Sequence, residues 1–198
     1  MKRFIFLGTL LACTMLTAQA QFNGGTGMAD DPYLIRRPAQ LANLSTILNQ
    51  EGVVVKLQSD IDLTGYLEDE EFANEGWAPI GTSTEPFKGT VIGNGKKIKG
   101  LNINRPSESY VGLFGYLDGA DISDLTIECT AITGSSYLGT LAGNAKNCTL
   151  NNCHVSVENE ISSADGMSVG GVIGIASNCN ITNCDFEGTV SGSDSGVT

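Results

Sequence analysis

The sequence predicts an all-β protein, a single-stranded parallel β-helix with a short N-terminal capping helix. Two observations predict this fold: a repeat with a period of about 24–31 residues, and 25 glycines in 198 residues without the three-residue period of collagen. The repeat is too short for a pair of helices. It suits one coil of a solenoid, in which each turn of the chain adds one strand to each of several parallel sheets.

The first twenty residues are typical of a secretory signal peptide. Lys2 and Arg3 precede an apolar run, and Ala18-Gln19-Ala20 has the small-x-small pattern of a cleavage site. The apolar run is too short to span a membrane, so we expect no transmembrane segment. We expect residues 1–20 to be removed and the protein to be exported to the cell surface (outer membrane) or the extracellular space. A lipoprotein site at Cys13 is the second interpretation.

The charge of the mature chain limits its partners. Without the two cations of the signal peptide, 9 basic residues remain of the original 11, against 22 acidic residues, a net charge of −13. Such a chain is repelled by nucleic acid and by anionic membrane surfaces, so we expect neither as a partner.

Residues 21–63 are predicted to form an N-terminal cap, with a helix over about 38–50 and first strands at 53–57 and 61–63. Pro38 suits the first helical position, and Leu41, Leu44 and Leu48 give the helix one apolar face. Such a helix would cover the strand edges of the first coil.

Residues 64–86 are predicted to form an excursion loop, and residues 87–198 the repeat coils. Val197 falls about where Val111, Leu138 and Val169 begin their coils. We therefore expect the chain to be truncated at the C-terminus, with further β-helix coils beyond it.

Four segments share the pattern apolar-x-x-apolar-x-apolar, and they begin at Ile98, Ile122, Leu150 and Ile181. Seven residues before the last three lies the final glycine of a small apolar tetrad; these glycines are Gly115, Gly143 and Gly174. Polar pairs such as Asn151-Asn152 occupy the bends, where Asn tolerates left-handed backbone. Because coils stack about 4.8 Å apart, Asn152 is expected to lie under Asn183 as a rung of an asparagine ladder.

The tetrads G-L-F-G, T-L-A-G and G-V-I-G, each followed by an I-x-N-C-like strand, resemble the GLUG-motif repeats of adhesin-like bacterial surface proteins. The upstream runs G-T-G-M-A-D-D-P-Y-L-I and G-W-A-P-I-G-T are similar to the entry segment of these proteins. The resemblance implies an exported protein of Gram-negative bacteria, built on a right-handed β-helix and without a shared catalytic motif. The chain departs from the pattern at Thr140, where glycine is common, and at Val91-Ile92, where an aromatic residue and Asp often appear.

Two Cys-x4-Cys pairs raise the question of a zinc site, formed by Cys148, Cys153, Cys179 and Cys184. Zinc knuckles use tighter spacings, so we expect no metal and no cofactor. The repeat places Cys153 and Cys184 in the inward column of Leu101 and Leu125, and Cys148 and Cys179 in that of Ala120. We predict buried free thiols, with one vertical disulfide as the alternative.

Catalytic residues are not evident, so no enzyme is predicted. His154 is the sole histidine and alternates with inward residues, so it is expected to point outward without a nucleophile beside it. The acids Asp118, Asp121 and Asp124 are weak calcium candidates, with solvated carboxylates as the default.

Binding is the function that the remaining residues favour. Tyr110 and Tyr137 fall in one column, followed by Ser168, next to Val111 and its equivalents. If those apolar residues point inward, the tyrosines form an exposed aromatic platform. We predict an exported, non-catalytic, adhesin-like surface module that binds a glycan or a host or cell-surface protein. The alternatives are a carbohydrate-active β-helix enzyme (polysaccharide lyase or glycosidase) and a structural stalk or spacer of a longer surface protein.

Overall fold

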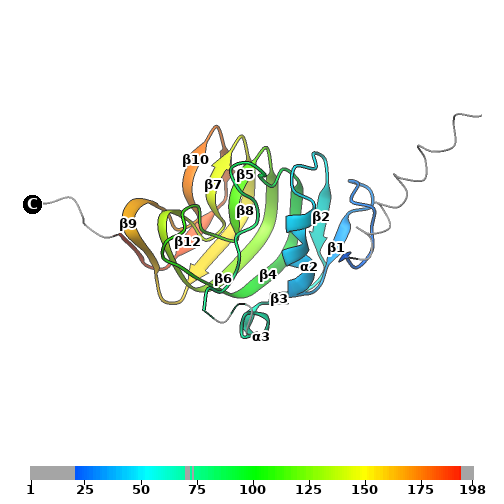
Figure 1. The fold of residues 1–198 in the computed structure, drawn as a ribbon. Helices are drawn as coiled ribbons and strands as arrows, with labels where there is room; N and C mark the ends of the chain where they lie inside the picture. Colours follow the sequence, from blue (N-terminus) through cyan, green and yellow to red (C-terminus); the bar gives the residue numbers. More distant parts are fainter. Residues whose placement is uncertain (1–20, 70–71, 73, 193–198) are drawn as a thin grey trace, which may run out of the picture.

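The chain folds into a parallel β-helix of about four coils (Figure 1). The computed structural model describes residues 21–69, 72 and 74–192. The expected signal peptide and the expected coil start at Val197 lie outside these residues. The predicted fold class, an all-β parallel β-helix with a short helix near the N-terminus, is confirmed.

Two long strands, β4 and β6, lie among shorter ones along the chain. The helical segments are α2 (Pro38–Ala42), the 3-10 helix η1 (Asn43–Thr46) and α3 (Thr64–Leu67). The strands are β1 (Tyr33–Ile35), β2 (Val54–Leu57), β3 (Ile61–Asp62), β4 (Thr90–Arg105), β5 (Phe114–Asp118), β6 (Asp121–Leu138), β7 (Ala142–Lys146), β8 (Thr149–Val157), β9 (Ile161–Val169), β10 (Ile173–Ser177), β11 (Asn180–Thr182), β12 (Asp185–Glu187) and β13 (Val190–Gly192).

The strands form two sheets whose members run parallel. The larger sheet follows the order β1-β2-β4-β6-β8-β11, with β3, β9, β12 and β13 joined to it, and the smaller sheet follows β10-β7-β5. Strands that are neighbours in a sheet belong to successive coils, so each residue lies over its counterpart one coil earlier. This register decides which side chains meet on the surface.

The register of the first coil differs from the sequence prediction. Ile122 pairs with Val91, not with Ile98, so the first repeat step is 31 residues rather than 24. Ile98 pairs with Ile127 and Leu101 with Cys129. The physical reason is a wider corner in β4, where a turn containing Asn94 (φ 57°) and Gly95 (φ 66°) adds two residues relative to β6. The pattern that begins at Ile98 therefore matches the wrong half of the coil.

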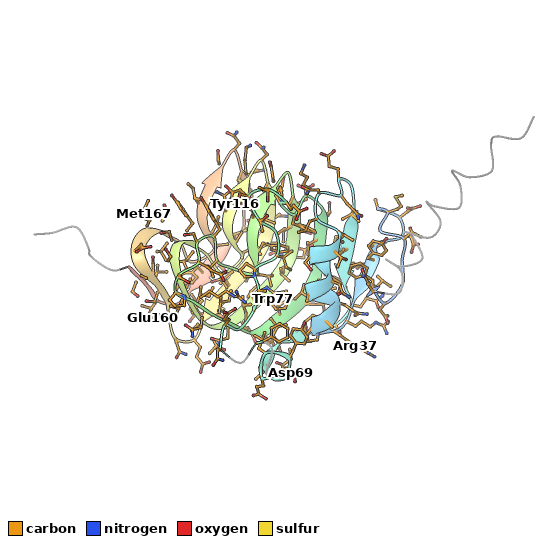
Figure 2. All side chains as sticks on the ribbon, in the orientation of Figure 1. Arg37, Asp69, Trp77, Tyr116, Glu160 and Met167 are labelled. Carbon is orange, nitrogen blue, oxygen red and sulfur yellow. The ribbon has the colours of Figure 1, made fainter. Side chains whose placement is uncertain are left out.

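The later coils keep the predicted register. Leu150 lies over Ile122 and under Ile181. The first two are at most 1% exposed, and together with their neighbours they form one continuous core. Trp77 also lies within the fold, and its indole Nε1 donates to the carbonyl oxygen of Leu113 at 3.0 Å (Figure 2).

The helix expected over about 38–50 is shorter than predicted. It is α-helical only over Pro38–Ala42 and then tightens into η1. The hydroxyls of Ser45 and Thr46 donate to carbonyl oxygens three residues earlier, and such local bonds compete with the α-helical ones. Leu41 and Leu44 are nonetheless buried against the core, and α2 lies toward the N-terminal end of the stack near β2 (Figure 1).

The excursion expected over 64–86 ends earlier than predicted. Ile80 forms a parallel bridge with Phe114, and Phe87 one with Leu117, so the chain has rejoined the smaller sheet by Ile80. Both Ile80 and Phe87 are buried, at 2% and 0% exposure. Burial of these two side chains holds this segment against the stack.

The tetrad glycines lie where one coil approaches the backbone of the coil before it. A Cβ at Gly143 would lie 2.3 Å from the carbonyl carbon of Tyr110, and one at Gly174 would lie 2.7 Å from that of Tyr137. A side chain at either position would force the coils apart. Thr140 replaces the first glycine of its tetrad, and in the described part of the chain its buried hydroxyl has no hydrogen-bond partner.

The last described coil leaves part of its apolar row uncovered. Ile181 and Val190 are 44% and 39% exposed, although their counterparts in the coil before, Leu150 and Ile161, are fully buried. No helix among the described residues has the length and hydropathy needed to cross a bilayer.

We predict that residues of the same apolar column contribute unequally to the free energy of unfolding. Leu150→Ala should lower the free energy of unfolding by about 2–5 kcal/mol, because it leaves a cavity in a covered layer. Ile181→Ala, in the same column but 44% exposed, should cost about 1 kcal/mol or less. Urea unfolding followed by circular dichroism measures both. Equal losses would contradict the burial gradient.

Candidate functional site

A column of tyrosines occupies one corner of the coils. Tyr110 and Tyr137 have the left-handed φ values 63° and 58°, and Ser168 follows in the next coil with φ 49°. The two phenol rings are parallel within 5°, with centroids 4.7 Å apart. That distance is the spacing of neighbouring strands, so the rings stack along the axis of the β-helix.

The adjacent residues settle which way the tyrosines face. Val111 pairs with Leu138, Leu138 pairs with Val169, and the first two are fully buried. Tyr110 and Tyr137 precede these inward residues and are partly exposed. Desolvation raises the pKa of Tyr110, and the neighbouring phenols of Tyr116 and Tyr137 raise it further, so its hydroxyl stays neutral at physiological pH.

The stack of Tyr110 and Tyr137 limits how much of each ring is accessible. Because the two rings cover each other, the edges of both rings, rather than the faces between them, are directed outward. Tyr116 packs against Tyr110 at 5.0 Å with an interplanar angle of 56°. Among the described residues, no other ring packs on Tyr137, which leaves one of its faces without an aromatic neighbour.

A second outward row runs beside this column on the smaller sheet. Tyr116 lies under Asn144, and Asn144 lies under Ile175. The row thus combines a phenol, an amide and an exposed aliphatic side chain. The tyrosine column and this row together form an amphipathic surface. We call it the tyrosine surface (Tyr110, Tyr116, Tyr137, Asn144, Ser168 and Ile175).

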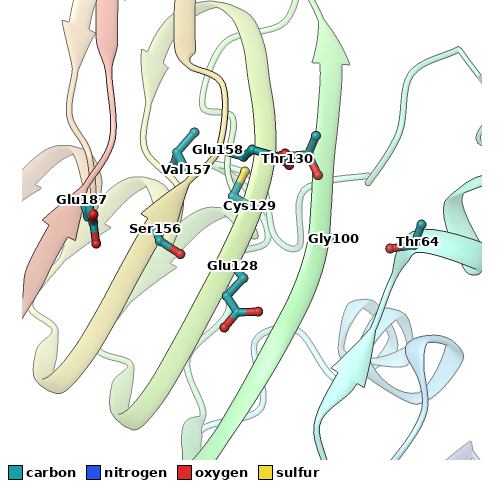
Figure 3. Close-up of a pocket in the computed structure, with 9 residues that line it drawn as sticks. All are labelled: Thr64, Gly100, Glu128, Cys129, Thr130, Ser156, Val157, Glu158 and Glu187. Atoms are coloured by element: carbon teal, nitrogen blue, oxygen red, sulfur yellow. The ribbon is translucent and has the colours of Figure 1, made fainter.

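An acidic groove lies elsewhere, along the outer face of the larger sheet (Figure 3). It has a volume of about 540 Å³. Glu128 from β6, Ser156 from β8 and Glu187 from β12 form one column across it, and Glu158 follows β8. Smaller hollows of about 450 and 260 Å³ share residues with it at either side. This groove was not predicted from the sequence, although residues 128, 156 and 187 repeat at the steps of 28 and 31 residues seen in the later coils.

The groove does not have the arrangement that a glycosidase acid requires. Glu158 and Glu187 are exposed, and Glu128 accepts a 2.5 Å hydrogen bond from the ammonium group of Lys97. A carboxylic acid that donates a proton near neutral pH needs an apolar enclosure, which none of these three has. The groove is therefore better suited to polar contact than to acid catalysis.

The acids named as calcium candidates have protein partners. Asp118 accepts a hydrogen bond from the amide of Asn147 at 2.9 Å and lies 3.9 Å from the ammonium of Lys146. Asp124 accepts from the amide of Asn152 at 2.8 Å. Asp121 is exposed on the strand between them. The described residues contain no group of three or more His, Cys, Asp or Glu that could hold a metal ion.

The asparagine ladder differs in its bonds from the prediction. Asp124, Asn152 and Asn183 share the expected left-handed column, with φ values of 54°, 57° and 53°. The amide of Asn152 bonds to Asp124, and that of Asn183 bonds to Asn151 at 3.4 Å rather than to Asn152. The Oδ1 of Asn152 is 3.1 Å from His154 Nε2, which takes the place of the next amide.

A second ladder occupies another corner and was not predicted. Asn178 donates to Asn147 at 3.4 Å, and Asn147 donates to Asp118. Both asparagines have positive φ, near 54°.

His154, expected to point outward, is 46% exposed, and its Nδ1 lies 2.8 Å from Asp185.

Four of the five cysteines in the described part of the chain stack in two columns, Cys148 with Cys179 and Cys153 with Cys184, and Cys129 lies in a third column under Val157. Cys153 lies over Leu125 as predicted, but Leu101 lies under Cys129 instead. Cys148, Cys153 and Cys129 are buried, Cys179 and Cys184 are half-buried, and all five are free thiols in the described part of the chain.

Residues 165–191 match the family model described as the GLUG motif. The chain carries a GLUG motif. The matched segment spans the end of β9 and the whole last described coil, including the tetrad at Gly171–Gly174. The GLUG repeat therefore corresponds to one coil of this β-helix, as the resemblance implied.

Two curated relatives match the chain. One carries the provisional name Gly-rich membrane protein, from Evansella cellulosilytica; it is 39% identical over 127 residues, which cover 62% of this chain and 14% of the relative. The other is Halomucin from Haloquadratum walsbyi, 37% identical over 120 residues, which cover 60% of this chain and 1% of the relative. The chain thus spans only a small share of the length of these relatives.

Among solved structures, the chain is similar to a protein from Bacteroides ovatus with the provisional name immunoglobulin A1 protease. The TM-score is 0.47 at 16% identity, and the match covers 88% of this chain and 71% of the other. We draw nothing further from this similarity.

We predict that thiol reactivity divides the cysteines. Burial raises the pKa of Cys129 and of Cys153 to about 12, and that of Cys148 to about 11. These three thiols stay protonated at pH 8 and should not react with an aromatic disulfide reagent in the native state. Cys179 and Cys184 are half-buried and should react first. Peptide mapping after labelling assigns each site; fast labelling of Cys153 in the folded protein would contradict the prediction.

Proposed function

We propose that the protein is an exported cell-surface module that acts by binding, and that the tyrosine surface contacts its ligand. The observation that supports this proposal most directly is the outward stack of Tyr110 and Tyr137 beside Tyr116. Partly exposed aromatic side chains with polar tips are enriched where proteins contact ligands. The proposed ligand is a glycan or a host protein, and the proposed role is adhesion.

The comparisons support placement at the surface. The GLUG motif matches a coil of the chain, and one relative is named as a membrane protein. We propose that the signal peptide at residues 1–20 directs export and that the protein is displayed on a Gram-negative cell. Binding is favoured over catalysis because the acidic groove has exposed or ion-paired carboxylates, and because His154 bonds to Asn152 and Asp185 rather than to a nucleophile.

We predict that ligand binding depends on the tyrosine surface. The purified protein should bind to an array of immobilised glycans and matrix proteins. The double variant Tyr110→Ala plus Tyr137→Ala should weaken that binding at least about tenfold, because it removes two aromatic contact surfaces. Tyr110→Phe plus Tyr137→Phe, which keeps the rings, is the matched control and should bind within about threefold of the wild type. Unchanged binding by the alanine variant, with unchanged circular dichroism, would refute this role.

A second candidate function is a spacer within a longer surface protein. The exposed side chains of Ile181 and Val190 favour it, because one more coil would cover them. In this role the β-helix separates other parts of the protein, and its own surface needs no ligand.

We predict that an added coil stabilises the stack. A second copy of residues 168–198, which is one 31-residue step of the repeat, should raise the unfolding temperature when fused after Thr198. The gain comes from burial of apolar surface that is now exposed. The same extension with Ile181→Ser and Val190→Ser in the original coil is the control and should show a smaller gain. An unfolding temperature that stays equal or falls would contradict the prediction that a further coil stacks on the last described coil.

A further inference from the structure

The tyrosine column ends at Tyr137, and the next position is occupied by a side chain much smaller than a ring. We propose that the free face of Tyr137 holds a neutral pyranose ring of a glycan, with the amide of Asn144 bonding to its hydroxyls. This inference rests on the proposed binding function and names the ligand class and the residues that select it.

The spacing of the column creates room for one ring. Tyr137 lies on Tyr110 at 4.7 Å, and Ser168 follows in the same left-handed conformation one coil later. Ser168 is exposed, and its hydroxymethyl group replaces the third phenol that would continue the stack. A pyranose has about the same ring width as the phenol that is replaced. It can lay its C–H face on the phenol of Tyr137, in the manner of a stacked ring.

Asn144 supplies a polar contact beside this space. In the row Tyr116, Asn144, Ile175, the first residue packs against Tyr110 at 5.0 Å. By the register, Asn144 occupies the same place relative to Tyr137, one coil later. It is half-buried, and its side-chain amide makes no hydrogen bond to the described residues. An unused amide beside an open aromatic face is suited to the paired hydroxyls of a sugar.

The remaining neighbours favour a sugar over a peptide side chain. At the level of Ser168, the exposed Ile175 gives the space one apolar wall, while the Ser168 hydroxyl gives it a second polar group. A sugar ring has one C–H face and a rim of hydroxyls, which matches an aromatic floor with polar groups at its edge.

Charge selects a neutral ring. The chain carries a formal net charge of −11, and −13 without the two cations of the expected signal peptide. The cation on β7, Lys146, lies 3.9 Å from Asp118 and is thus already paired. Uronic and sialic acids would therefore meet a repulsive field without a free cation on this strand. Neutral hexoses avoid this cost.

The test is saturation-transfer NMR on the purified protein with three probes: methyl β-D-galactopyranoside, methyl β-D-glucopyranoside and the anionic methyl β-D-glucuronide. We expect saturation on the C–H protons of one face of at least one neutral probe, and none on the glucuronide. Tyr137→Ala should weaken binding of that probe at least about tenfold, and Tyr137→Phe should leave it within about threefold. Asn144→Ala should weaken it about fivefold or more.

Met28→Ala is the control, because it removes a large exposed apolar side chain that lies outside the tyrosine column. It should keep most of the binding of the neutral probe. Absence of saturation on both neutral probes, or equal binding by wild type and Tyr137→Ala, would overturn the inference. If Tyr110 and Tyr137 are still required for binding to the array, the proposed function stands and only the sugar assignment fails. If the array also shows no dependence on them, both fail.

Discussion

Vertical pairing between parallel strands is the constraint on which the rest of this structure depends. Each coil is held by hydrogen bonds to the coil before it, and no coil can bury its apolar row alone. In the coils from β4 onward, residues 28–31 positions apart are therefore nearest neighbours, and side chains at this spacing form columns on the surface. The core row from Val91 to Leu150, the two asparagine ladders and the tyrosine stack all follow from this one rule.

The same rule explains what could be predicted from the sequence. The fold, the positions of the tetrads and the columns of Cys148, Cys153 and Tyr110 depend only on the repeat in the later coils, where the spacing is regular. The register of the first coil could not be predicted from the pattern, because the turn at Asn94-Gly95 adds residues at a corner without changing which positions are apolar. The length of the helix depended on local hydroxyl bonds of Ser45 and Thr46, which leucine periodicity does not reveal.

The candidate site was predictable only in part. That Tyr110 and Tyr137 share a column follows from their spacing, but their outward direction could be decided only from the burial of Val111 and Leu138. The proposed role of Asn144 and the position of the acidic groove both depend on contacts between different strands. A single apolar pattern contains no information on such contacts, although a search for polar residues at the repeat step would have aligned Glu128 with Ser156 and Glu187.

The left-handed backbone of the tyrosine column has a consequence for how this protein can evolve. At the other corners the same conformation is taken by Asn or Asp, which tolerate it well, whereas a bulky aromatic residue adopts it at a cost of about 1 kcal/mol. Exchanging Tyr137 for Asn or Gly would therefore relieve backbone strain while it removes the exposed ring. Under the proposed binding role, stability and recognition are therefore opposed at Tyr137, and variants selected only for thermal robustness would lose its ring.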